Sequence, residues 1–338
     1  MGDCYSRNVR NERRSSNNHK REKRKIPIQS VRVQNHDRSI HPRSFAGLDA
    51  FDPASMSPPV HQDHHYHSEL DLIADIAREA GILVLKYYDT TYTIESKGRA
   101  GPVTEADKRA NELIIDRLTR SFPHDAIVAE ESPLSDYAVE PERIWYVDPL
   151  DGTKEFIAKN GEFSVMIGLA VKGRAFLGAV YQPTANRLYT GMTESGAWLE
   201  ASQGVRIALH VSSRQAPHEL RLAASRSHRH PILDQICQKT GITQEIRYGS
   251  VGLKIGLIAT GQADLYIEPT PYTSAWDACA PEAILRGAGG RFTDLRGEAI
   301  CYSCHEVRNT NGLLATNGIC HDWLIQTISP LLAFPLVG

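Results

Sequence analysis

The sequence predicts a mixed fold in which an α+β half packs on an α/β half. Two amphipathic helical patterns come first, β-rich runs follow to about residue 200, and strands then alternate with helices. A chain of 338 residues, 41% hydrophobic and 23% charged, is long enough for two domains with buried cores. We therefore expect one domain over 66–200, a second over 201–330 and a short C-terminal tail over 331–338.

Two helices are expected at the start of the ordered region. Apolar residues recur on one helix stripe over 68–88, and Ser68 is a suitable N-cap residue. The segment 104–123 repeats this pattern from a Thr104 cap and ends at Pro123. Ordered structure is therefore predicted to begin at Ser68.

The β-rich and alternating segments complete the predicted fold. Short buried strands over 125–132 and 143–148 run directly into acidic residues, and such strand ends are common places for functional sites. Two β-rich runs flank a turn at Lys172-Gly173. Short β segments follow at 186–192 and 196–200, and the later elements are strands at 220–225, 263–269 and 291–294, helices at 231–241, 252–261 and 276–290, the segment 312–318 and a last helix.

The N-terminal region differs in composition from the rest. Residues 1–43 contain 12 Lys and Arg against 4 Asp and Glu, whereas the whole chain has a formal charge of −2. A segment this polar cannot bury enough apolar surface to offset the entropy lost when it orders. We therefore expect a disordered basic extension over 1–65. It could be a nucleic-acid-binding arm, a transit peptide, or a solvated extension upstream of a true start at Met56. We favour the solvated extension and expect no nucleic-acid partner.

Composition also excludes several classes of protein. No run approaches the roughly 18 uncharged apolar residues of a membrane span, and no apolar core follows the basic N-terminus. We expect a cytoplasmic protein without a membrane partner, and both a monomer and a homodimer fit the sequence. Six cysteines in so long a chain are expected to be reduced.

One motif points elsewhere. The segment 301–305, CYSCH, matches the C-x-x-C-H pattern of c-type haem attachment. Haem attachment would need export, and no second cysteine pair completes a four-ligand zinc site. We expect the match to be a coincidence, with a redox role for Cys301 and Cys304 left open.

The chemistry is predicted from acidic residues at element junctions. Asp148 and Asp151 stand three residues apart, and such close like charges are driven toward protonation unless a cation lies between them. With Glu130 and Asp277 they offer hard oxygen ligands that suit magnesium. If Asp148 bridges two ions, these would lie about 3.5 to 4 Å apart, as in phosphoryl transfer. The backbone N–H groups expected to hold phosphate oxygens belong to Gly152 and Thr153.

Each of these acids also has a purely structural explanation. Asp277 could cap its helix, and Asp107 could be the acid of a capping box with Thr104. Residues 149–152 could form an ordinary β-turn, and Glu130 could be a surface acid. The order of the acids along the chain, and their fit to one pattern, favour a shared site.

The motifs around these acids resemble a known family. The segments EES, DPLDGTKEF and WDACAPEAILRGAGG resemble the signatures of the inositol monophosphatase superfamily of lithium-sensitive, magnesium-dependent phosphatases, over about residues 68–330. WYVDPLDGTKEFI, NGEFSV, LGAVYQP and ASRSH are most similar to its CysQ-type 3′(2′),5′-bisphosphate nucleotidase branch. Inositol monophosphatases usually show Asn where Lys154-Glu155 stand. The resemblance implies a layered α/β/α/β/α sandwich.

The resemblance also implies an activity and a substrate. The reaction would be hydrolysis of the 3′-phosphate of adenosine 3′,5′-bisphosphate, a by-product of sulfate assimilation, by an activated water and without a covalent intermediate. 3′-Phosphoadenosine 5′-phosphosulfate is a second candidate substrate. Inositol or fructose phosphates would be cleaved by the same site in near variants. A binding module with a nucleic-acid-contacting tail is the non-enzymatic alternative, but a retired site has no physical reason to keep four repelling carboxylates.

The resemblance assigns roles residue by residue. Two to three magnesium ions are implied, and Asp107 and Thr153 would activate the attacking water. Glu131 would lie just outside the metal ligands. The implied metal ligands are Glu130, Asp148, the Leu150 carbonyl, Asp151 and Asp277, and the implied substrate-binding residues are Gly152, Thr153, Ser225, His228, Ser250 and Lys254. A surface-loop role stays open for His228, and a spacing to Lys254 one residue longer than in some relatives leaves Ser250 open.

Overall fold

The computed structural model describes residues 60–90, 94–96, 102–134, 137–201 and 204–332. Most of the expected N-terminal disorder, the proposed start at Met56 and nearly all of the C-terminal tail lie outside these residues. The first helix, α1, spans Val60–Tyr88, so the Ser68 cap was wrong, and the disordered extension over 1–65 stays a prediction. No glycine or proline interrupts 60–67, and the Tyr66 ring packs on Phe176 with centroids 4.5 Å apart, which extends the helix.

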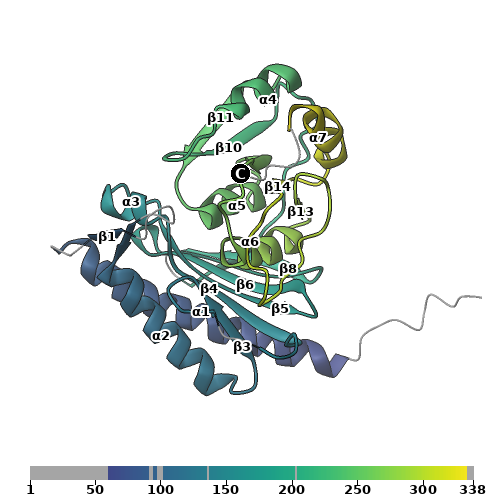
Figure 1. Ribbon diagram of the computed structural model, residues 1–338. Helices are drawn as coiled ribbons and strands as arrows, with labels where there is room; N and C mark the ends of the chain where they lie inside the picture. The colour runs from purple at the N-terminus through teal and green to yellow at the C-terminus, as the bar shows by residue number, and fades with distance from the viewer. Residues whose placement is uncertain (1–59, 91–93, 97–101, 135–136, 202–203, 333–338) are drawn as a thin grey trace, which may run out of the picture. The chain divides into compact units, whose positions relative to one another are not determined.

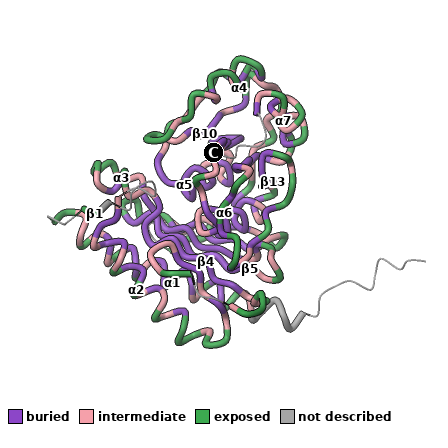
Figure 2. Tube along the Cα trace, viewed as in Figure 1, coloured by how far each residue is buried: buried purple, intermediate pink, exposed green. Residues whose placement is uncertain are grey.

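A seven-stranded sheet forms the larger layer of the fold. Its strand order is β3-β4-β5-β6-β7-β8-β9, and every neighbouring pair is antiparallel except the parallel pair β3 and β4. Figure 2 shows β4 and β5 buried along most of their length. The strands are β3 (Ala126–Ala129), β4 (Arg143–Asp151), β5 (Ser164–Val171), β6 (Arg174–Gln182), β7 (Arg187–Met192), β8 (Gly196–Glu200) and β9 (Arg206–Ala208).

Helices cover both faces of this sheet. Side chains alternate between faces along a strand, so Trp145 and Val147 of β4 join the core under α1 and α2 (Glu105–Ser121), whereas Ile144 and Tyr146 join the core under α5 (Val251–Ala259) and α6 (Ala275–Gly287). Figure 1 shows α1 and α2 on one side of the sheet and α6 on the other.

Helix α6 lies unusually close to the sheet. A Cβ atom added at Gly178 of β6 would come within 2.5 Å of the Ala280 carbonyl oxygen, and one at Gly168 of β5 within 2.5 Å of the Ala280 nitrogen. Side chains at these positions would therefore push the helix away. This close approach fixes α6, which carries Asp277, against the sheet whose strand β4 carries Asp148.

A second, five-stranded sheet completes the layers. Its order is β11-β10-β12-β14-β13, with β10 parallel to both neighbours and β14 antiparallel to both of its own. Helices α5 and α6 pack on its inner face, and α4 and α7 share the core on its outer face. The elements are β10 (Arg221–Ser225), α4 (Ile232–Thr240), β11 (Gln244–Tyr248), β12 (Leu265–Glu268), β13 (Arg291–Thr293), β14 (Leu313–Thr316) and α7 (His321–Ile328).

The layers run helix, sheet, helix, sheet, helix, so the predicted sandwich is confirmed. The strands that were not predicted are the short pair β1 (Ile94–Ser96) and β2 (Pro102–Thr104), β9, and β11. The division into two domains near residue 200 stays a prediction. None of the helices among the described residues is long and apolar enough to cross a membrane.

Glu282 gives the fold a pH dependence that can be measured. Its side chain is buried in α6, accepts a hydrogen bond from the Tyr302 hydroxyl at 2.6 Å, and has its pKa raised to about 7, chiefly by burial. The unfolded chain has a Glu pKa near 4.3, so between about pH 4.3 and 7 the folded state binds more protons and the free energy of unfolding falls as pH rises. We expect Glu282→Gln to remove most of this fall, which is on the order of 3 kcal/mol.

Urea unfolding of both proteins from pH 5 to 8 checks this expectation. Glu194→Gln is the matched control, because Glu194 also pairs with Arg286 but is exposed. A wild-type stability that does not change across this range would contradict the assignment.

Candidate active site

The end of β4 carries the first two acids of the site. Asp148 pairs with Met166 and Asp151 with Ser164 on β5, and the register shifts between the two pairs. Residues 149–152 are therefore an irregular strand end, and the β-turn alternative was wrong. The shift is a β-bulge, which re-aims side chains next to it. Asp148 is held in place by the Leu150 backbone N–H, which donates to its Oδ1 at 2.9 Å.

Asp277 enters from the start of α6. The Ser274 backbone N–H donates to its Oδ2 at 2.6 Å in a capping box. The capping alternative and the ligand assignment are therefore compatible, because a carboxylate has a second oxygen to offer. Asp148, Asp151 and Asp277 present ligand atoms that all lie within 4.8 Å of one another, and this group can hold a metal ion.

Electrostatics explains why this group suits a cation. Burial raises the pKa of Asp148 well above its ordinary value, and the charges of Glu130, Asp151 and Asp277 raise it further. The pKa of Asp277 is raised in the same way, by burial first and then by Asp151 and Glu130. A divalent cation bound by oxygen ligands would remove this repulsion. Glu130 and the neighbouring Glu131 follow β3 and are partly buried.

Asp151 is supported from behind by the start of α5. The Ser250 hydroxyl donates to Asp151 Oδ2, and the Gly252 backbone N–H donates to the same oxygen at 2.9 Å. Lys254 is buried, and its ammonium donates to the Ser250 carbonyl at 2.7 Å. Burial raises the pKa of Asp151, and the positive charge of Lys254 opposes that rise. The assignments of Ser250 and Lys254 to the substrate stay predictions.

Asp107 and Thr153 meet beside these acids. Asp107 Oδ2 accepts the backbone N–H of Thr104 at 2.8 Å in a capping box, so the helix cap fixes the direction of the carboxylate. Its Oδ1 lies 3.1 Å from the Thr153 hydroxyl oxygen, which is also 3.2 Å from the Leu150 carbonyl oxygen. Burial raises the pKa of Asp107. A hydroxyl that donates to Asp107 keeps lone pairs with which it can accept a proton from water.

A short helix, α3 (Thr153–Ile157), follows the acids directly. Its N-cap is Gly152, with φ of 93°, and a Cβ atom there would meet the Glu162 carbonyl oxygen at 3.0 Å. A left-handed conformation and this close contact both favour glycine. The use of the Gly152 and Thr153 N–H groups for phosphate stays a prediction.

Ser225 ends β10, and His228 lies in the loop that follows. The His228 backbone N–H donates to the Ser225 hydroxyl at 3.0 Å, and its ring Nε2 lies 2.5 Å from Lys154 Nζ. Desolvation of the ring, followed by the charge of Lys154, lowers the pKa of His228. Ser227 of the same loop donates to the buried Glu155.

Sequence reasoning missed these loop contacts. Its one usable signal was Lys154-Glu155, the dipeptide that separates the nucleotidase branch from inositol monophosphatases. Both residues of this dipeptide contact the loop that carries His228. Glu162 also contacts this loop. Its carboxylate forms an ion pair with Arg226 and accepts the Gly249 backbone N–H.

Comparison with known proteins places the chain in a family. The family model described as the inositol monophosphatase family matches residues 67–332. The chain is 38% identical over 240 residues to the 3′(2′),5′-bisphosphate nucleotidase CysQ of Escherichia coli strain K12. The matched region covers 70% of this chain and 95% of that protein. It is 31% identical over 283 residues to an inositol-1-monophosphatase of Synechocystis, over 81% of this chain and 93% of that one.

The fold agrees with these matches. The crystal structure of CysQ from Bacteroides thetaiotaomicron, a bacterial member of the inositol monophosphatase family, superposes with a TM-score of 0.61 at 29% identity and covers 74% of this chain and 97% of that one. The family model covers most of the described residues, including all the acids of the site. The chain therefore belongs to the inositol monophosphatase family.

Proposed function

We propose that this chain is a magnesium-dependent 3′(2′),5′-bisphosphate nucleotidase that hydrolyses the 3′-phosphate of adenosine 3′,5′-bisphosphate. The observation that carries the proposal is the acid group of the buried Asp148 and Asp151 and the partly buried Asp277, beside the Asp107–Thr153 pair. The 38% identity to the CysQ protein supports the nucleotide as substrate. 3′-Phosphoadenosine 5′-phosphosulfate shares the 3′-phosphate and is the second candidate substrate.

In this proposal the acid group and the Leu150 carbonyl would hold two to three magnesium ions, with Glu130 as the remaining carboxylate. Bound magnesium supplies a water of lowered pKa and neutralises charge on the transferred phosphoryl group. The Thr153 hydroxyl would orient the attacking water and take up a proton from it, and Asp107, 3.1 Å away, would take the proton that the hydroxyl gives up. The Gly152 and Thr153 N–H groups hold phosphate oxygens at the start of α3.

Selection of the nucleotide is assigned to the loop after β10. Ser225 ends β10 and His228 lies on the loop, and the Lys154–His228 and Glu155–Ser227 contacts attach the loop to the helix that begins at Thr153. A substrate phosphate on Thr153 would thus have its nucleoside within reach of His228. Lys154 adds a positive charge that favours a doubly phosphorylated substrate.

A second candidate is inositol or fructose phosphate hydrolysis by the same site, because the chain is also 31% identical to an inositol-1-monophosphatase. Phosphate release with magnesium should be measured side by side from adenosine 3′,5′-bisphosphate, 3′-phosphoadenosine 5′-phosphosulfate, inositol 1-phosphate and fructose 1,6-bisphosphate, and repeated with lithium. The proposal predicts preference for the two nucleotides and inhibition by lithium. Preference for a sugar phosphate would keep the metal site and overturn the nucleotide assignment.

Deletion of residues 1–55 is expected to leave turnover unchanged. All the residues assigned to the site lie between Asp107 and Asp277, and the family match begins at residue 67. The measurement is kcat/KM for adenosine 3′,5′-bisphosphate at matched ionic strength, because the basic segment could attract an anionic substrate at low salt. A large loss of activity at physiological salt would show that the tail takes part in catalysis.

A further inference from the structure

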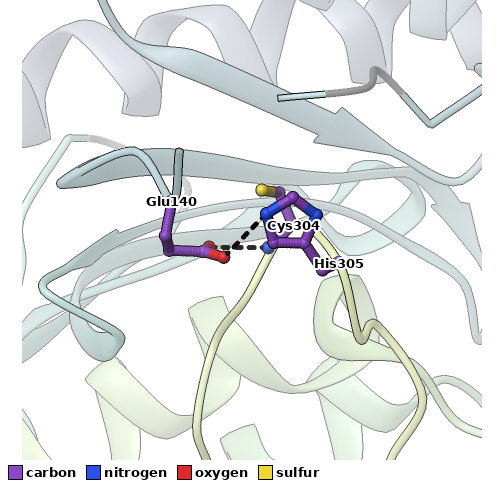
Figure 3. Close-up of side chains that lie close together, drawn as sticks. All are labelled: Glu140, Cys304 and His305. Carbon is purple, nitrogen blue, oxygen red and sulfur yellow. Dashed lines mark hydrogen bonds and ion pairs between the residues drawn. The ribbon is translucent and has the colours of Figure 1, made fainter. Parts of the chain in front are cut away.

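A second group of metal-binding side chains lies at the other end of β4 from Asp148 and Asp151. Glu140 precedes the strand, and Cys304 and His305 lie in the loop between β13 and β14. Their carboxylate oxygen, sulfur and imidazole nitrogen lie within 4.8 Å of one another, and Figure 3 shows the Glu140 carboxylate turned toward the other two residues. We propose that Glu140, Cys304 and His305 form a transition-metal site, with zinc as the expected ion.

Hydrogen bonds hold these ligands together before any ion binds. Glu140 Oε1 accepts the Cys304 backbone N–H at 2.8 Å, and Oε2 accepts the Ser303 hydroxyl at 2.9 Å. The His305 backbone N–H donates to the same hydroxyl at 3.1 Å, and its ring Nε2 lies 3.5 Å from Glu140 Oε2. The loop is thus folded around a carboxylate from a distant part of the chain, so little ordering is left for an ion to impose.

The donor set and its dimensions fit zinc. Zinc takes sulfur at about 2.3 Å and nitrogen or carboxylate oxygen at about 2.0 to 2.2 Å, so tetrahedral ligand atoms lie roughly 3.3 to 3.7 Å apart. The His305 Nε2 and Glu140 Oε2 atoms already have this separation at 3.5 Å, and the sulfur lies within 4.8 Å of both ligand residues, a gap that side-chain rotation can close. Magnesium and calcium prefer oxygen donors, so they do not compete for a site with a thiolate and an imidazole.

Two further observations support the site. The Cys304 side chain is buried, so the sulfur faces the Glu140 carboxylate and not open solvent. A cavity of about 530 Å³ opens beside the cluster, lined by Glu140, Cys301 and Ser303 among others. It admits an ion, and water can complete four ligands from it.

The sequence lacks a second cysteine pair, which argued against zinc, but the structure supplies a carboxylate and an imidazole as ligands instead.

Metal bound at this site would stabilise the folded protein. Its loop also holds the start of α6, since Val307 accepts the Ala275 backbone N–H at 2.7 Å and Asn309 donates to the Ser274 carbonyl at 2.8 Å. An ion bound to the native state alone raises its unfolding temperature.

Titration of the full chain with Co²⁺, under a reductant and with excess magnesium, tests the proposal. Sulfur bound to Co²⁺ gives a charge-transfer absorption in the near ultraviolet, which an all-oxygen site such as the acid group cannot give. We expect this band to saturate at one ion per chain, and zinc to abolish it by competition. Zinc should also raise the unfolding temperature.

Variants identify the ligands. Cys304→Ser should lose the band, whereas Cys237→Ser, a thiol outside the cluster, should keep it. His305→Ala is at an exposed position, so it should fold and bind Co²⁺ at least tenfold more weakly. Ser303→Ala removes the hydroxyl that orients Glu140, so it should bind Co²⁺ roughly 10- to 100-fold more weakly. Absence of the band in the wild type, or an equal band in folded Cys304→Ser, would overturn the site. Neither result would bear on the phosphatase activity, which uses other residues.

Discussion

Asp151→Asn is expected to lower magnesium-dependent turnover by at least about 100-fold while leaving the protein folded. The substitution removes one of the three acids that lie within 4.8 Å of one another, so a bound metal ion would lose one negatively charged ligand. The asparagine oxygen can still accept from Ser250 and Gly252, which hold Asp151 in the native protein. Because burial raises the pKa of Asp151, a neutral side chain is compatible with this position when metal is absent, and we expect the variant to fold.

Phosphate release and thermal unfolding of the same preparation separate these two effects. Asp116→Asn serves as the control, because Asp116 lies on α2 and pairs with Arg120 in the next turn of the helix. A folded Asp151→Asn enzyme with full activity would rule out the metal assignment. An unfolded one would show that the carboxylate is structural.

Thr153→Val is expected to lower kcat by about 10² to 10⁴-fold, with a much smaller change in KM. Valine fills the same volume but lacks the hydroxyl that lies 3.1 Å from Asp107 and 3.2 Å from the Leu150 carbonyl. If Thr153 passes a proton to Asp107, the double variant with Asp107→Asn should be little slower than either single variant, because residues that act as a unit are not additive.

Steady-state kinetics of the three variants and of Thr153→Ser check this expectation. Serine keeps the hydroxyl, so it should recover most of the activity. Losses that simply multiply in the double variant would show that the two residues act independently. Equal kcat for valine and threonine would remove Thr153 from the chemistry.

Much of the fold could be predicted because its signals are local. The apolar stripe that ends at Pro123 defines α2, and the strand-like runs on either side of Lys172-Gly173 became β5 and β6. Capping chemistry is also local, so Thr104 and Asp107 could be placed at a helix start. The strand β11 was missed because it lies at the edge of its sheet, where none of its residues is fully buried and no apolar alternation is required.

The acid group was found because its members follow strands or begin helices, which bring them to one place in a layered fold. The contacts that complete the site have no such signal. Lys154 meets His228 74 residues later, and Glu140 meets Cys304 164 residues later. Loop contacts at this separation depend on how whole layers pack, and no periodicity in the sequence records that packing.

The most direct test of the account is magnesium-dependent release of phosphate from adenosine 3′,5′-bisphosphate by the full-length protein after complete chelation of metals. We predict no release above the buffer rate in the chelated protein, and recovery of turnover on addition of magnesium, with adenosine 5′-monophosphate and phosphate formed in equal amounts. Turnover that persists after chelation would contradict a metal-held phosphatase site. A protein that stays inactive at every magnesium concentration would contradict the nucleotidase assignment.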